Sequence, residues 1–481
     1  MDTTKNQGLQ MRLSVLLLTT LVMMSATTAT AQEFRAGAAT TNITPWLGIS
    51  LAGNMRDNPA RAVHDELHVR ALVLDDGLTE LAFGIVDSCM VPRELMESAK
   101  STAAEATGIP PCNMLIAATH SHSAGCATGV FQSEPDPTYQ MFLTRRIADA
   151  IILAHGNLTP ARIGWGEARL PDEVFNRRWH MKPGAIPPDP FGNTTDRVKM
   201  NPPRGGDDLI EPAGPTDPTI AFISVQRADG TPLALLANYA LHYVGGTGGG
   251  EVSADYFGIF ANRIGALMGA SETAPPFVGI MTNGASGNIN NIDFRVPGEA
   301  LAPYEKMTSV AHKAAAAVFD ALTEVTYQDT INLGARQTVI ELGVRKPTEE
   351  DLTEARAIVD TVEGPEMKTL REIYARETLL LSEYPNSVPV TLQALRIGGL
   401  AIVAVPCEVF VETGLDIKAR SGFEQTMLIE LANGYNGYLP TAEQHALGGY
   451  ETWRARSSYL EVHAAEKITE TLLGLLEEGQ Q

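Results

Sequence analysis

The sequence predicts an α/β fold: a mixed β-sheet with helices on its faces and a functional site at the ends of its strands. Three stretches share one plan, an apolar run, a turn containing glycine and a second apolar run: 70–88, 219–242 and 389–410. Turn glycines between β-branched runs are typical of hairpins. Elsewhere, apolar residues recur three and four positions apart, as in helices. Strands mixed with helices in this way indicate a layered α/β protein.

The second strand of each expected hairpin is nearly all apolar, which is typical of a strand buried on both faces. These three strands end on Asp87, His242 and Glu408. Two single apolar runs also end in polar residues, "NMLIAATHSH" at 113–122 and "TMLIELANGYNGY" at 426–438. Ligands bind beyond the strand ends in open α/β sheets. The polar residues at these five ends are therefore candidates for one shared site.

Five segments have the apolar spacing of helices, and one long segment has no clear periodicity. Residues 171–216 are rich in proline, glycine and charge, which predicts a long surface excursion over the sheet. The helices are expected at 93–107, 138–155, 255–269, 303–323 and 348–382.

The first 31 residues are expected to be a signal peptide. Lys5 and Arg12 precede the apolar run "LSVLLLTTLVMM", and an Ala-x-Ala site ends at Ala31. An uncleaved anchor or a buried helix is the alternative. No later segment has 18 consecutive apolar residues, so no stable membrane insertion is expected after cleavage. Residues 32–481 would then form one domain of a secreted or periplasmic protein.

Composition excludes some partners. The net charge of −21 argues against nucleic acid or an anionic membrane surface. The four cysteines form no C-x-x-C pair and are expected to be mostly buried thiols.

Two short motifs resemble catalytic signatures without matching them. "HDELH" at 64–68 is not a zincin motif, because aspartate follows its first histidine. "GASGN" at 284–288 is not a serine nucleophile elbow.

The motif "AATHSHS" at 117–123 raises the possibility of a metal site. Side chains two apart share a face of an extended strand, so His120 and His122 could point into one space. His120, His242 and Glu408 would then offer two imidazoles and a carboxylate, which zinc favours as ligands in catalytic sites. The alternative is a set of hydrogen-bonded polar residues at buried strand ends.

In these residues the sequence resembles the neutral/alkaline non-lysosomal ceramidase family, specifically its N-terminal catalytic domain. The resemblance implies a zinc-dependent amidase that hydrolyses an N-acylsphingosine or related N-acyl substrate, with metal-activated water as the nucleophile. It covers most of residues 32–481 and runs through the motifs "AGAATTNITP", "VDSCM", "AATHSHSAG", "NRR", "SADYFG", "TNGASGNINN", "VPCEVF" and "NGYNGYLPTAEQHALGGYE".

The resemblance also implies roles for individual residues. Four residues would bind zinc: His120, His242, Glu408 and Tyr438. Three catalytic residues would face the substrate: His122, Arg177 and Tyr450. Of these, His122 and Tyr450 would lie near a developing oxyanion.

Two features depart from the family. Asn290 stands where the family has a serine, which favours activated water over a serine nucleophile. The chain ends at Gln481, soon after the last motif, so we expect no C-terminal β-sandwich. A more soluble substrate than ceramide is therefore expected. The alternatives are a zinc hydrolase of another amide or ester, or a non-catalytic secreted binding protein on the same fold.

Overall fold

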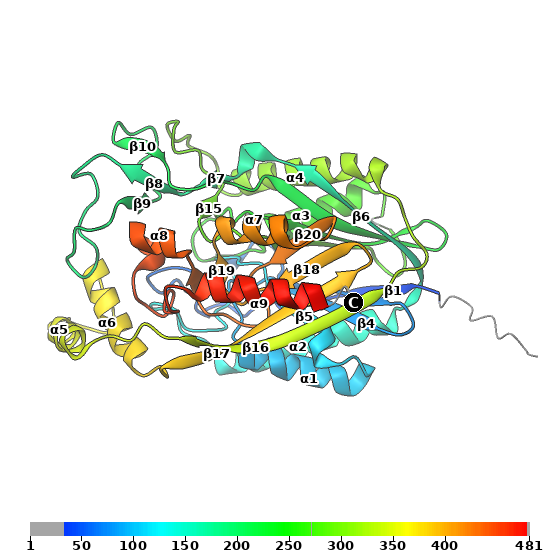
Figure 1. The fold of residues 1–481 in the computed structure, drawn as a ribbon, viewed down its shortest axis with the longest axis horizontal. Helices are drawn as coiled ribbons and strands as arrows, with labels where there is room; N and C mark the ends of the chain where they lie inside the picture. Colours follow the sequence, from blue (N-terminus) through cyan, green and yellow to red (C-terminus); the bar gives the residue numbers. More distant parts are fainter. Residues whose placement is uncertain (1–32, 271, 479–481) are drawn as a thin grey trace, which may run out of the picture. The chain divides into compact units, whose positions relative to one another are not determined.

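Two β-sheets of unequal size pack against each other in the computed structural model, which describes residues 33–270 and 272–478 (Figure 1). The expected signal peptide at 1–31 lies outside these residues. The larger sheet has the strand order β14-β12-β11-β6-β1-β3-β4-β5, and the smaller has the order β16-β17-β18-β20. Their strands are β1 (Arg35–Asn42), β3 (His68–Asp75), β4 (Glu80–Val86), β5 (Met114–Ala118), β6 (Thr159–Arg169), β11 (Thr219–Arg227), β12 (Pro232–Tyr239), β14 (Val278–Asn283), β16 (Leu333–Gly343), β17 (Ser387–Ile397), β18 (Leu400–Ala404) and β20 (Gln425–Ile429).

Three hairpins, each followed by a parallel strand, form the framework of both sheets. β3 and β4 pair antiparallel, and β5 then lies parallel to β4. The strands β11, β12 and β14 repeat this arrangement, and so do β17, β18 and β20. These are the three hairpins predicted from the sequence, and β5 and β20 are the two predicted single strands. In each unit the second hairpin strand and its parallel partner end at the same edge, which is where the polar residues follow.

Helices cover the outer face of each sheet, while the inner faces share one core. Phe83 of β4 and Ile402 of β18 are fully buried members of that core. The α/β class with mixed sheets is therefore confirmed, but the strands divide between two sheets. Central strands such as β4 and β18 are buried on both faces because one face meets helices and the other meets the second sheet. The helices on the outer faces are α1 (Arg93–Thr107), α2 (Pro137–Gly156), α3 (Asp255–Leu267), α4 (Glu305–Ala321), α7 (Val411–Arg420) and α9 (Ala464–Glu478).

The segment expected to be one helix at 348–382 is two helices, so that prediction is wrong. α5 (Glu349–Val359) and α6 (Leu370–Ser382) pack on each other. Gly364 has a left-handed φ of 91°, and Pro365 follows it, so the helix cannot continue. Thr348 and Thr369 each begin a helix with a capping box.

The proline-rich excursion at 171–216 is more ordered than the sequence suggests. It contains β7 (Phe175–Asn176), and β8 (Arg178–Met181) pairs with both β9 (Val198–Met200) and β10 (Leu209–Pro212). β7 pairs with β15 (Ile289–Asn290). Its arginines Arg177 and Arg178 are buried, so the prediction of a surface segment is wrong for this part.

The C-terminal part of the described chain is short. After Tyr450 it forms η4 (Tyr450–Thr452) and α9, and up to residue 478 it adds no β-sandwich. In the described ranges no helix is both long and apolar enough to cross a membrane. All four cysteines are free; three are buried and Cys112 is exposed.

Candidate metal centre

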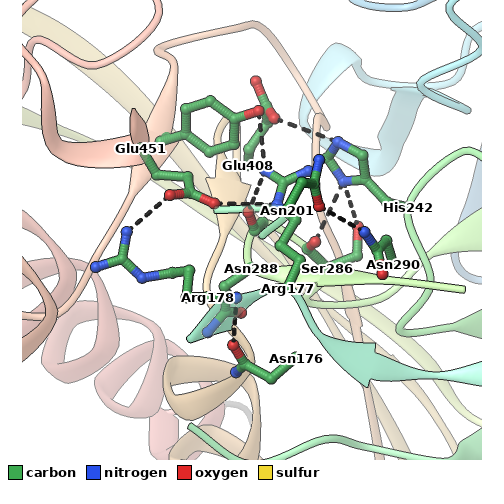
Figure 2. A network of polar contacts seen from close by, with 12 residues as sticks. Asn176, Arg177, Arg178, Asn201, His242, Ser286, Asn288, Asn290, Glu408 and Glu451 are labelled. Atoms are coloured by element: carbon green, nitrogen blue, oxygen red, sulfur yellow. Dashed lines mark hydrogen bonds and ion pairs between the residues drawn. The ribbon is translucent and has the colours of Figure 1, made fainter. Parts of the chain in front are cut away.

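His120, His242 and Glu408 meet at the edge where β5, β12 and β18 end. The Nε2 atoms of His120 and His242 are 3.0 Å apart. Glu408 Oε2 lies 3.4 Å from His120 Nε2 and 3.8 Å from His242 Nε2. All three side chains are buried, and these three residues could together hold a metal ion. Figure 2 shows His242 and Glu408 facing each other in this network.

His120 reaches the centre by a backbone turn. β5 ends at Ala118, and His120 has a left-handed φ of 66°, so the extended geometry expected for the two histidines is wrong. The expected proximity is nevertheless present, because His122 Nε2 lies 3.1 Å from His120 Nε2. A non-glycine residue in this region of φ is strained by about 1–3 kcal/mol, and such strain often accompanies function.

Backbone carbonyls fix the tautomer of both ligand histidines. Nδ1 of His120 lies 2.8 Å from the carbonyl oxygen of Cys89, and Nδ1 of His242 lies 3.2 Å from that of Ser286. A carbonyl only accepts hydrogen bonds, so each Nδ1 carries the proton and each Nε2 has a lone pair. Two lone pairs facing each other at this distance require a positive charge between them.

The electrostatics of the centre agree with a bound cation. Burial and then the charge of Arg177 hold the pKa of His242 well below its ordinary value. Burial alone would lower the pKa of His120, but Cys89 and Glu408 outweigh burial and raise it well above the usual range. When no metal ion is bound, the centre therefore favours a proton on His120. A metal ion would displace that proton on binding.

Glu408 has one oxygen bound and one without a hydrogen-bond partner. Tyr435 donates its hydroxyl hydrogen to Oε1 at 3.0 Å, whereas the buried Oε2 accepts none. Burial raises the pKa of this carboxyl, but His120, Tyr438 and Arg177 outweigh burial and lower it overall. An ionised oxygen that is buried and lacks a hydrogen bond is costly unless a cation lies beside it. The residues present therefore fit a metal ion.

Tyr438 and Arg177 complete one side of the centre. The strands β19 (Glu408–Val409) and β21 (Tyr438–Leu439) pair parallel, which puts Tyr438 directly beside Glu408. Arg177 donates through Nη2 to the Tyr438 hydroxyl at 3.1 Å. Through Nε it donates to Glu451 at 3.0 Å (Figure 2). The Arg177 side chain is thus buried between Tyr438 and Glu451, and it orients the Tyr438 hydroxyl.

His122 and Tyr450 lie where the centre is least covered, and both are only partly buried. His122 stacks on Tyr243 with ring centroids 3.6 Å apart. Its Nδ1 edge adjoins Gly53, whose backbone hydrogen-bonds the ring; a Cβ on that glycine would lie 2.3 Å from Nδ1. Burial and the neighbouring His120 keep the pKa of His122 well below its ordinary value, so the ring is neutral, and its Nε2 faces His120.

A small cavity of about 200 Å³ adjoins the partly open side of the centre. Its wall includes Tyr450, whose ring packs edge-on against Tyr438 at 5.7 Å, and it also includes Met55, two residues from Gly53. Met200, Leu370 and Trp453 add apolar surface. The cavity could hold an apolar group attached to a reacting bond at the centre.

Asp87 and Asn290 lie outside the centre. Arg70 Nη1 donates to both oxygens of Asp87 at 2.7 Å, so the expectation that all five strand ends share one site is wrong for β4. Asn290 donates to Asn201 at 2.8 Å. Ser286 lies behind His242, and its hydroxyl hydrogen is donated to Glu430.

Sequence reasoning missed Tyr435, Tyr243, Cys89 and Glu430. Tyr243 directly follows a predicted ligand, and Tyr435 lies three residues before another. Those short separations were signals that could have identified them. Cys89 and Glu430 act through a backbone carbonyl and through a serine, so no residue pattern marks them.

Solved structures with the same architecture are known. No family model matches the chain. Neutral ceramidase from Pseudomonas aeruginosa has a TM-score of 0.67 and 17% identity, over 92% of this chain and 74% of that one. A ceramidase complexed with C2 has a TM-score of 0.68 and 16% identity, over 93% of this chain and 75% of that one. The chain has the fold of neutral ceramidase. The resemblance inferred from the sequence motifs is confirmed at the level of the fold.

Proposed function

We propose that the protein is a ceramidase-like, zinc-dependent hydrolase of an amide bond in an N-acyl substrate. The observation that carries the proposal is the convergence of two histidine lone pairs on a buried glutamate oxygen that accepts no hydrogen bond. The shared fold with neutral ceramidases supports the reaction class.

Zinc is the metal that the donor set favours. Two imidazole nitrogens and a carboxylate oxygen are typical ligands of catalytic zinc. The residues that would hold the ion are His120, His242 and Glu408, with the Tyr438 hydroxyl as the fourth ligand that the family resemblance implies. When bound, zinc polarises a carbonyl and lowers the pKa of water to roughly 7.

The side chains around the ion would position the substrate and move the proton. Neutral His122 accepts a proton at Nε2 from the attacking water and returns it to the leaving nitrogen, a role typically worth 10²- to 10⁴-fold in rate. Tyr450 donates its hydroxyl hydrogen to the developing oxyanion. Arg177 holds Tyr438 in place from its position between that hydroxyl and Glu451. The apolar cavity beside Tyr450 receives the acyl group.

Activity on a panel of N-acyl compounds, with and without a chelator, tests the proposal. The reaction should stop on chelation and recover with added zinc. His122→Ala should retain zinc and lose at least 100-fold in kcat/KM, which separates the proton-transfer role from metal binding. Zinc-loaded protein that hydrolyses none of the panel would contradict the amidase assignment. The leader at 1–31 is proposed to direct export, and processing at Ala31 can be checked by N-terminal sequencing of the exported protein.

A further inference from the structure

Glu430 is a buried carboxyl that lies one layer behind the candidate ligands. It follows β20 and is fully buried. Three neutral donors bind it: the Ser286 hydroxyl at Oε1, and the backbone N–H groups of Ser286 at 3.3 Å and Val409 at 2.7 Å at Oε2. In the described ranges no lysine or arginine pairs with it.

These donors belong to the segment that carries Glu408 and to the loop after β14, which packs behind His242. Val409 directly follows Glu408, and the Ser286 carbonyl oxygen and hydroxyl lie 3.2 and 3.4 Å from His242 Nδ1. The segments touch closely, since a Cβ on Gly287 would lie 2.6 Å from the Glu408 carbonyl oxygen. One carboxyl therefore binds both the segment that carries Glu408 and the loop that hydrogen-bonds His242.

We propose that Glu430 is a positioning residue that sets the separation of Glu408 and His242 and, through Ser286, holds His242 in the tautomer that binds the ion. This inference rests on the proposed metal centre. It resembles the carboxylate–histidine–metal arrangement common around metal ions, with a serine between the carboxylate and the histidine.

The charge of Glu430 supports this role. Burial raises the pKa of this carboxyl to about 8, so the ionised form needs a nearby positive charge at neutral pH. Its hydrogen bonds suit the ionised form, because all three partners can donate. A divalent ion held by Glu408 would leave one positive charge uncompensated, and ionised Glu430 would balance it.

Zinc affinity of the purified full chain, measured by competition with a chromogenic chelator, tests the inference without an activity assay. Glu430→Gln keeps the shape but reverses the sense of the bond to Ser286, and we expect a 10- to 100-fold loss of zinc affinity. Glu412→Gln is the matched control, because the side chains that donate to Glu412 within the described residues are Asn288 and Gln444, and this variant should change affinity less than twofold. Thermal melts with and without zinc show whether each variant is folded.

A double-mutant cycle tests whether Glu430 affects zinc binding through Ser286. In a Ser286→Ala background, Glu430→Gln should lose at least half of its effect on the logarithm of the zinc affinity. Wild-type affinity in folded Glu430→Gln, or equal losses in Glu412→Gln, would overturn the inference. A wild-type protein that binds no zinc would overturn both this inference and the metal assignment, whereas zinc binding without hydrolysis would overturn only the proposed reaction.

Discussion

Main-chain carbonyl oxygens are the nearest acceptors for Nδ1 of both ligand histidines. The acceptors are the carbonyl oxygens of Cys89 and Ser286. A side-chain substitution at Cys89 leaves its carbonyl in place, whereas Ser286→Ala also removes a hydroxyl that lies 3.4 Å from His242 Nδ1. At this scale the side chains that should matter most are those that donate a lone pair to the ion.

Ser286→Ala should retain most hydrolytic activity when zinc is saturating, whereas chelation should abolish it. The Ser286 hydroxyl is buried behind His242 and donates to Glu430, so it cannot attack a substrate. Activity at saturating zinc measures this. A folded, zinc-loaded Ser286→Ala protein without activity would show that serine is the nucleophile after all.

His120→Ala and His242→Ala should each lower the zinc content from about one ion per chain to less than a tenth, because each substitution removes one of the few protein ligands of a catalytic zinc site. Elemental analysis after gel filtration measures this content. His64→Ala is the control, because His64 is exposed and stacks on Tyr304 away from the centre. Equal zinc in all three variants would disprove the ligand assignment.

At the scale of elements, α1 is tied to the segment after β20 by a buried lysine. Lys100 donates to the side-chain oxygen of Asn433 at 2.7 Å, and Asn433 has a left-handed φ of 63°. This segment then carries Tyr435 and Tyr438 to the centre. In the described chain no carboxylate pairs with Lys100, so its positive charge is poorly solvated.

Lys100→Met should stabilise the protein at pH 7 and lose that advantage at pH 10. Burial lowers the pKa of Lys100 to about 8 from 10.5, so the folded state binds its proton more weakly than the unfolded state does. The buried charge of Lys100 therefore lowers the free energy of unfolding by about 3 kcal/mol below pH 8. This destabilisation decreases as the pH rises toward 10.5. Loss of the bond to Asn433 offsets about 1 kcal/mol.

Urea unfolding of wild type and Lys100→Met at pH 7 and pH 10 checks this prediction. The difference in the free energy of unfolding should shrink as the pH rises. A difference that is the same at both pH values would mean that Lys100 keeps its proton over this range.

Hairpins and helices were largely predictable because their signals are local. The apolar pattern could not show that the strands form two sheets, because a strand buried on both faces looks the same whether a helix or a sheet covers it. The break between α5 and α6 was visible in Gly364–Pro365 and the two threonine caps. The separation of Asp87 from the centre was not predictable, since it depends on Arg70 in the neighbouring strand.

The site was predictable only in part for a similar reason. The motifs identified side chains that converge, namely His120, His242, Glu408 and Tyr438. Cys89 and Glu430 act through contacts between distant segments, and only the three-dimensional structure reveals such contacts.

At the scale of the whole molecule, the centre has one partly open side and a small cavity beside it. The volume of about 200 Å³ is below the roughly 300–1,000 Å³ of common small-molecule pockets. The net charge of −21 opposes approach to an anionic bilayer. Both features favour a short acyl group over a membrane lipid with two long chains.

Short-chain N-acyl substrates should therefore have a higher kcat/KM than long-chain ceramide when detergent is held constant. Comparison of one amine with acyl chains of increasing length measures the preference. A tenfold or greater preference for long-chain ceramide, about 1.4 kcal/mol of transition-state binding, would reverse this prediction.

The three units of hairpin and parallel strand supply the ligands from widely separated parts of the chain. His120 lies in its first third, whereas Glu408 and Tyr438 lie in its last fifth. A nascent chain, or one cleaved before Tyr438, would lack part of the ligand set. The metal ion would thus bind only after the segments that carry all the ligands have been synthesised and folded together. A copy damaged in this way should therefore lose its metal ion and its activity together, instead of acting with altered selectivity.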